Sequence, residues 1–252
     1  MLTFICAFYI LILFASQGEA IIRFENPIVF VSNRGRTLDT PFEVSLMGPE
    51  GGNMRVLISD DTRKLSPTWS PDGRIAFTRF ERRGMKDIYI MNPDGTGLRR
   101  LTNHPMDDCY PAWSSDGRWV AFQTNRDGNW EIYITDPYGR MLKNLSRHPA
   151  SDTQPCWSPD GKRIAFISSR GEGSNIFIMD VSMGRVINLT GKYRELELVG
   201  GFSYPAWSPD GKWIAFSGYV VGVLNWDIYI IDTRGEHLRK LTSSPHPDVH
   251  PT

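Results

Sequence analysis

The sequence predicts an all-β protein, a β-propeller built from four-stranded antiparallel blades. Three observations predict this fold. A short pattern recurs along the chain, an Asp-Gly turn lies inside each copy, and two more strand-like runs follow each copy. The clearest copy is residues 205–216, P-A-W-S-P-D-G-K-W-I-A-F. No stretch shows the sustained 3.6-residue period of a helix, so a four-stranded repeat of about 44 residues indicates propeller blades.

Each copy carries one tryptophan, and we expect all four to be buried between blades. Their spacings are 44, 44 and 50 residues, and they are Trp69, Trp113, Trp157 and Trp207. The Asp-Gly pair that follows each tryptophan is predicted to form a tight hairpin turn, because glycine readily adopts positive φ and aspartate tolerates it. The pairs are Asp72 with Gly73, Asp116 with Gly117, Asp160 with Gly161 and Asp210 with Gly211.

Four predicted strands make one unit, and we name them A to D from the inner strand to the outer one. Strands A and B flank the Asp-Gly turn. β-Branched and aromatic runs then predict strand C, at residues 87–91, 131–134, 175–179 and 227–231. A shorter run predicts strand D, at residues 98–102, 142–146, 186–190 and 238–242.

The first unit lacks its own strand A. Residues 28–32 match strand B, residues 42–46 match strand C and residues 54–59 match strand D. At the other end, residues 248–252 match the start of a strand A. We therefore expect five blades, closed into a ring by the carboxy-terminal strand pairing with residues 28–32. The units are approximately 28–65, 66–109, 110–153, 154–203 and 204–252.

Residues 1–20 have the pattern of a signal peptide. Residues 2–15 are a continuous apolar run of 14 residues, which is short for a membrane span, and Gly18 and Ala20 offer a small-x-small cleavage site. The prediction is therefore an exported single domain over residues 21–252 without a membrane span after cleavage. Removing Glu19 leaves 28 basic and 27 acidic residues, a net charge of +1. That charge supplies no basic field for nucleic acid.

The repeat P-A-W-S-P-D-G-K-W-I-A-F, followed by D-I-Y-I and L-R-K-L-T, resembles the propeller repeat of the TolB-like family. The resemblance covers residues 28–252. It implies a periplasmic or secreted protein of the cell envelope, and for TolB itself a part in the Tol-Pal translocation system. The resemblance implies that TolB itself has six blades, preceded in its chain by a mixed α/β domain. Five units are expected here, without such a domain between residues 20 and 28.

Patterns of catalytic and metal sites are missing from the sequence. The string nearest to G-x-S-x-G, residues 201–205, departs from it at the last position. His104 and His148 are one repeat apart, so they are expected on neighbouring blades rather than around one metal ion. The prediction is therefore no enzyme, no metal and no cofactor. Cys109 and Cys156 remain after export, and whether they are free or bridged stays open.

The segment that enters strand A varies among the units, and we predict that it forms a binding site at the mouth of the central channel. Tyrosine there offers contact area and a hydrogen bond at low entropic cost. The candidates are Tyr110, Gln154, Tyr204, His250, Asp108, Asp152 and Asp248, with Ser66, Lys64 and Phe202 at equivalent positions. The alternative is that these side chains satisfy neighbouring backbone groups. Arg34, Arg126 and Arg170 recur in the loop between strands B and C and are expected to form structural ion pairs instead.

Three functions follow from this reading. The preferred one is a non-enzymatic, exported and monomeric propeller that binds a protein or peptide at the channel mouth. The second is a ligand-binding or carbohydrate-active propeller, for which several histidines on inner strands would be the sign. The third is a fragment of a larger TolB-like or peptidase-associated protein. Fold alone does not decide among them.

Overall fold

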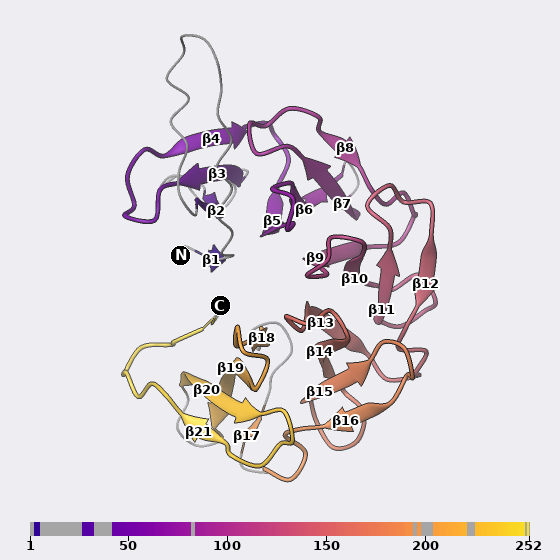
Figure 1. Cartoon of the computed structure of the whole chain (residues 1–252), viewed down its shortest axis with the longest axis vertical. Coiled ribbons are helices and arrows are strands. Elements are labelled where there is room, and N and C mark those ends of the chain that lie inside the picture. The colour runs from indigo at the N-terminus through magenta and orange to yellow at the C-terminus, as the bar shows by residue number, and fades with distance from the viewer. Residues whose placement is uncertain are drawn as a thin grey trace.

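The computed structural model describes residues 3–5, 27–32, 42–81, 84–193, 196–197, 204–220, 225–249 and 251. Five antiparallel sheets are arranged around a central axis, in chain order (Figure 1). Strands and turns make up this part of the chain, and no helix in it has the length and apolar character needed to cross a membrane. The prediction of an all-β propeller with five blades is confirmed.

Within each blade the strands follow one another from the axis outward. Blade 1 contains β1 (Thr3–Ile5), β2 (Ile28–Ser32), β3 (Glu43–Met47) and β4 (Arg55–Ile58). Blade 2 contains β5 (Lys64–Trp69), β6 (Ile75–Phe80), β7 (Lys86–Met91) and β8 (Arg99–Arg100). Blade 3 contains β9 (Asp108–Trp113), β10 (Val120–Thr124), β11 (Glu131–Thr135) and β12 (Leu142–Asn144).

The last two blades differ in their inner strands. Blade 4 contains β13 (Asp152–Trp157), β14 (Arg163–Ser168), β15 (Asn175–Asp180) and β16 (Val186–Asn188). Blade 5 contains β17 (Leu196–Glu197), β18 (Ala206–Trp207), β19 (Trp213–Val220), β20 (Trp226–Asp232) and β21 (Arg239–Lys240). Both β17 and β18 pair with β19, so the inner strand of blade 5 is in two pieces.

The core lies between consecutive blades. The phenylalanine of strand B is at most 1% exposed in all five blades, at Phe30, Phe77, Phe122, Phe166 and Phe216. In blades 2 to 5 it packs against the aromatic residue of strand C, with ring centroids 5.9–6.1 Å apart. Four apolar clusters each join two consecutive blades. Burial of these strand B and strand C side chains explains why I-A-F and D-I-Y-I recur in the repeat.

The Asp-Gly turns have the predicted form. In blade 3, the Gly117 amide donates to the Ser114 carbonyl over 2.9 Å, and Gly117 has φ of +69°. The Ser114 hydroxyl donates to Asp116 over 2.6 Å and accepts from the amide of Trp119 over 2.9 Å. The same hydroxyl-to-aspartate and amide-to-hydroxyl bonds recur in blades 2, 4 and 5. Serine and aspartate therefore fix the hairpin between strands A and B.

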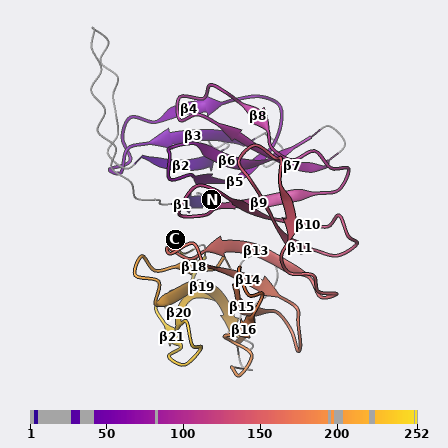
Figure 2. The same ribbon diagram turned by 45° about the vertical axis from the view of Figure 1, so that its right-hand side comes forward.

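The ring is not closed as expected. β1 pairs antiparallel with β2, with Phe4 opposite Phe30, so residues 3–5 take the strand A position that we assigned to the carboxy terminus. Residues 241–249 contain no strand. A strand edge accepts any extended segment, and Thr-Phe-Ile has high β propensity. Figures 1 and 2 show the two ends of the chain close together on the inner side of the ring.

The carboxy-terminal segment nevertheless begins like a strand A. The Asp248 amide donates to the Trp226 carbonyl over 2.8 Å, as the Asp152 amide donates to the Trp130 carbonyl over 2.7 Å at the start of blade 4. The expected closing strand was residues 249–252. The structure describes residues 249 and 251 of it, and residues 250 and 252 lie outside the described residues.

Candidate functional site

One residue in the inner strand of blades 2 to 5 has a left-handed backbone. These are Ser66, Tyr110, Gln154 and Tyr204, with φ of 51°, 57°, 53° and 36°. Each precedes a proline. In blades 2 to 4 the strand A ladder shifts register at this point, because proline has no amide to donate and belongs at a bulge of an edge strand. Such strain in non-glycine residues concentrates at functional sites.

The freed amides of Tyr110, Gln154 and Tyr204 are bonded to polar side chains of the preceding blade. The Tyr110 amide donates to Thr78 Oγ1 over 3.1 Å, and the Gln154 amide donates to Gln123 Oε1 over 2.9 Å. In blade 4 the position of Gln123 is held by Ile167, which cannot accept. The Gln154 side chain replaces it and accepts from the Tyr204 amide over 2.9 Å. Gln154 therefore links three blades.

Tyr110 and Tyr204 meet inside the ring. Tyr110 is on blade 3 and Tyr204 begins blade 5, yet their ring centroids are 6.2 Å apart. The two phenols also share a hydrogen bond. Burial raises the pKa of Tyr110 and, more strongly, the pKa of Tyr204. Both side chains are therefore protonated at neutral pH and offer aromatic surface with a neutral hydroxyl.

A cavity of about 290 Å³ is lined by Tyr110, but not by Tyr204, and is bounded by blades 2, 3 and 4. Its walls include two of the predicted residues, Tyr110 and Gln154, together with Ser66. Sequence reasoning did not select the other walls, which are Leu65, Thr78, Lys86, Cys109, Gln123, Trp130 and Thr153. For Thr78 and Gln123 the signal was a polar residue directly after the buried I-A-F or V-A-F of strand B.

The cavity is mostly neutral. Its one cationic side chain, Lys86, has its ammonium 2.5 Å from Asp107. Burial raises the pKa of the Cys109 thiol to about 12, so this thiol is not a nucleophile at neutral pH. Cys109 and Cys156 are both free thiols. Amide, hydroxyl and aromatic groups of this kind suit an uncharged polar ligand such as a peptide backbone.

The predicted aspartates have a different role from the tyrosines. Asp108 is fully buried and accepts two bonds from Arg126, over 2.9 and 3.0 Å. Asp152 is fully buried and accepts from Arg170 over 2.6 Å. The structure therefore gives these carboxylates a structural partner rather than a channel surface, which corrects their place among the mouth residues and matches the ion pairs expected for Arg126 and Arg170.

Blade 2 reverses the charges of this pair. Lys64 stands at the position of Asp108, is fully buried, and donates to Asp60 and to the Thr62 carbonyl. Arg79 is 3.1 Å from the same Asp60 carboxylate. Of the other predicted mouth residues, Asp248 is partly buried, and His250 and Phe202 lie outside the described residues, as does Arg34.

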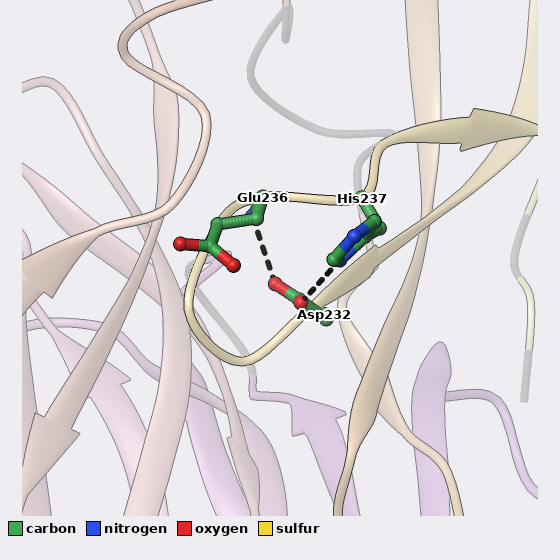
Figure 3. Close-up of side chains that lie close together, drawn as sticks. All are labelled: Asp232, Glu236 and His237. Carbon is green, nitrogen blue, oxygen red and sulfur yellow. Dashed lines mark hydrogen bonds and ion pairs between the residues drawn. The ribbon is translucent and has the colours of Figure 1, made fainter.

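Three side chains near the end of the chain have the spacing of metal ligands: Asp232, Glu236 and His237 (Figure 3). Asp232 accepts from the Glu236 amide over 2.8 Å, and its other oxygen is 2.8 Å from His237 Nδ1. Arg234 is 3.3 Å from that same oxygen. The equivalent Asp136 also caps its turn, because its carboxylate accepts from the backbone amide of Arg140 over 2.6 Å. Turn formation therefore accounts for this cluster.

Comparison with known proteins agrees with this architecture. A direct sequence comparison with curated proteins gave no match. TolB from Acinetobacter baumannii is similar to the chain, with a TM-score of 0.73 and 28% identity over 87% of this chain and 53% of that one. The chain thus spans about half the length of that protein.

Two enzymes are similar in fold alone. A puromycin hydrolase has a TM-score of 0.65 and 20% identity, over 87% of this chain and 37% of its own. An oligogalacturonate lyase in complex with manganese has a TM-score of 0.57 and 17% identity, over 76% and 58%. The TolB β-propeller domain family matches residues 20–198, more than half of the 252 residues. The chain therefore belongs to the TolB β-propeller domain family.

Proposed function

We propose that this propeller is a non-enzymatic, exported scaffold that binds an extended peptide segment of a partner protein at the channel cavity. The observation that supports this proposal most is that Tyr110, which lines the 290 Å³ cavity, also contacts Tyr204 of blade 5. Two tyrosines from blades 3 and 5 present aromatic surface, and Gln154 and Ser66 add polar groups that match a peptide backbone. Among the residues lining this cavity, no nucleophile is paired with a base, which supports binding rather than catalysis.

Export and the place of action belong to the same proposal. The support is the apolar run of residues 2–15 with its small-x-small site, together with membership of the TolB β-propeller family. We expect the protein to act in the periplasm as a monomer. The test compares a chain that has residues 1–20 with a chain that lacks them, both expressed in the same cell type and followed by cell fractionation. We expect the first in the periplasm and the second in the cytoplasm. Equal amounts in the cytoplasm would contradict export.

A quantitative pull-down tests the binding role. Residues 21–252 carry an affinity tag, and capture is compared with a Tyr110→Ala, Tyr204→Ala double variant. The matched control is Tyr138→Ala, which removes a tyrosine that is 62% exposed on the outer turn of blade 3. Circular dichroism melting establishes that each variant is folded.

We expect the partner captured by the original protein and by the Tyr138 variant to be lost from the double variant. Removing two central aromatic contacts costs roughly 2 kcal/mol or more each at an interface, which is enough to abolish capture. If the folded double variant retains the same partners in the same amounts, the channel cavity is not the binding site.

A further inference from the structure

A second polar cavity lies on the outer half of blade 3, away from the channel. It is an open groove of about 510 Å³ between the loop that joins β10 to β11, the strands β11 and β12, and the segment that follows β12. Its walls include Asp127, Glu131, Tyr133, Asn144, Arg147 and His148. The tyrosine is on strand C, two residues after Glu131, and Asn144 is directly opposite it on strand D. The equivalent positions in blades 2, 4 and 5 show what this groove lacks.

Blades 2, 4 and 5 balance charge at these positions. In blade 2, Asp87 on strand C is fully buried, and its carboxylate is 2.5 Å from Arg100 on strand D. In blade 5, Asp227 is 1% exposed, and its carboxylate is 2.6 Å from Lys240. Arg100 and Lys240 stand opposite the strand C tyrosine, as Asn144 does in blade 3. A buried acid is therefore matched by a cation.

Blade 4 is balanced without charges. Its strand C residue is Asn175, and the residue opposite the strand C aromatic is Asn188. The side-chain oxygen of Asn175 accepts from the Thr190 hydroxyl over 3.0 Å. A neutral residue on strand C therefore goes with a neutral residue on strand D.

Blade 3 keeps the acid but lacks the cation. Glu131 is 5% exposed, and it accepts from the His148 amide over 3.1 Å and from the Asn144 amide. The same Asn144 amide donates to Asp127 over 3.1 Å, and Tyr133 donates its hydroxyl to Asp127. In the described part of the chain, no lysine, arginine or histidine side chain pairs with either carboxylate. The described donors to these two carboxylates are thus all neutral, and the Asn144 side-chain amide serves both at the wall of an open groove.

We propose that this groove binds the guanidinium group of an arginine side chain from a partner polypeptide. The ligand would occupy the place that Arg100 occupies in blade 2. A buried carboxylate is costly without a cation, and a guanidinium offers five donors in a planar fork that can serve two carboxylates at once. The Arg126 guanidinium already covers the Tyr133 ring, 4.9 Å from its centroid, and is held by Asp108. The incoming cation therefore reaches Glu131 and Asp127 from the open side.

This inference is independent of the channel proposal, because the groove and the channel cavity share no residue. The probe is the peptide acetyl-Gly-Arg-Gly-amide, and its control is the same peptide with neutral citrulline. Both are titrated into the ¹⁵N-labelled protein and followed by NMR. The reporters are the His148 backbone amide and the Asn144 side-chain amide, which donate to Glu131. We expect these signals to shift with the arginine peptide and not with citrulline.

Two variants test which groups hold the ligand. Glu131→Gln removes the buried charge and should weaken peptide binding by about tenfold or more, as for the loss of a hydrogen bond to a charged group. The Tyr110→Ala, Tyr204→Ala variant should bind the arginine peptide unchanged, so that failure of the channel proposal and failure of this one are distinguishable. Equal shifts with citrulline, or an unchanged affinity in Glu131→Gln, would overturn the proposal.

A third variant places a cation of the protein's own chain in the groove. Asn144→Arg should raise the melting temperature and abolish the peptide shifts, since it supplies the cation that blade 2 has. The matched control is Asn188→Arg, which lies opposite Phe177 in the blade that has the neutral Asn175 and should not raise the melting temperature. Both asparagines accept a backbone amide at present, so that loss is common to the two variants. No gain of Asn144→Arg over Asn188→Arg would contradict the proposal.

Arg147 lines the groove, and its own side chain is the competing occupant. Arg147→Ala should leave the melting temperature and the peptide affinity unchanged if the groove is open to a partner. A lower melting temperature together with tighter peptide binding would show that Arg147 already fills the site, and would overturn the proposal.

Discussion

The four interfaces between consecutive blades are built differently from the junction between blade 5 and blade 1. Each interface has a buried apolar cluster with members from both blades, such as Ala76, Ile90, Trp113 and Phe122 between blades 2 and 3. No cluster joins blade 5 to blade 1 among the residues that the structure describes. The buried apolar clusters of the described residues therefore hold together blades that are consecutive in the chain, and β1 adds backbone pairing to β2 within blade 1.

The tryptophans differ between the middle interfaces and the outer ones. Trp113 and Trp157, in the middle blades, are each 7% exposed, and their indole nitrogens are buried without a hydrogen bond among the described residues. Trp69 and Trp207, nearer the ends, are partly exposed. Their indoles donate to the Pro27 and Cys156 carbonyls, over 3.1 and 3.0 Å. The expectation of burial holds fully for the middle pair and in part for the outer pair.

Truncation of a middle tryptophan should have the largest effect. We expect Trp113→Ala to lower the free energy of unfolding by about 3–5 kcal/mol, as for other buried aromatic residues. Trp69→Ala should cost clearly less, because its ring is already partly in water. Urea unfolding of both variants measures the difference. Equal losses would contradict the contrast between middle and end, and a loss under about 1 kcal/mol for Trp113 would place its ring on the surface.

The next largest effect should come from the link among blades 3, 4 and 5. Gln154→Leu leaves the Tyr204 amide without an acceptor, and we expect a loss of about 1–3 kcal/mol in the free energy of unfolding. Gln154→Glu retains an acceptor oxygen and serves as the control. Stability is measured by urea unfolding at neutral pH. If leucine and glutamate lower stability equally, the side-chain acceptor is not what stabilises this interface.

The junction between blades 5 and 1 should give a smaller effect that depends on the amino terminus. In residues 21–252, which lack β1, deletion of residues 247–252 should lower the melting temperature by several degrees and promote association. A few ladder bonds at about 1 kcal/mol each, and about 2–4 °C per kcal/mol for a domain of this size, give that size of shift. An exposed edge of β2 explains the association.

The control for this deletion is the chain that retains residues 1–20. There β1 already covers β2, so the deletion should leave melting and oligomeric state unchanged. Scanning calorimetry and size-exclusion chromatography measure both quantities. If the deletion is silent in the shorter chain too, the carboxy-terminal segment does not take the place of β1.

The smallest expected effect concerns the left-handed residues of strand A. Ser66 has φ of 51°, and Ser66→Gly should raise the free energy of unfolding by no more than about 1 kcal/mol, since glycine adopts this conformation without steric cost. Thr68→Gly, in the same strand, is the control and should be destabilising. A loss of stability in Ser66→Gly would show that the serine side chain contributes more than its backbone strain costs.

Much of this protein follows from the sequence by itself, because the information is local. The Asp-Gly turns, the four-strand repeat and the five units need only residues close together in the chain, and the structure has all of them. The position of Tyr110, Gln154 and Tyr204 three residues before each tryptophan was also visible, because the segment that enters strand A varies among otherwise similar repeats. Proximity to the channel then follows from repeat symmetry.

Only the tertiary structure decided which side chains form the buried ion pairs and which strand covers β2. The Asp108–Arg126 pair buries a carboxylate that the sequence suggested for the channel, and blade 2 builds the same corner from Lys64 and Asp60. The strand beside β2 is β1 because the open edge accepts whichever extended segment reaches it, and several segments have the required β propensity. Such pairing depends on the distances between residues in space, and no local pattern in the sequence contains those distances.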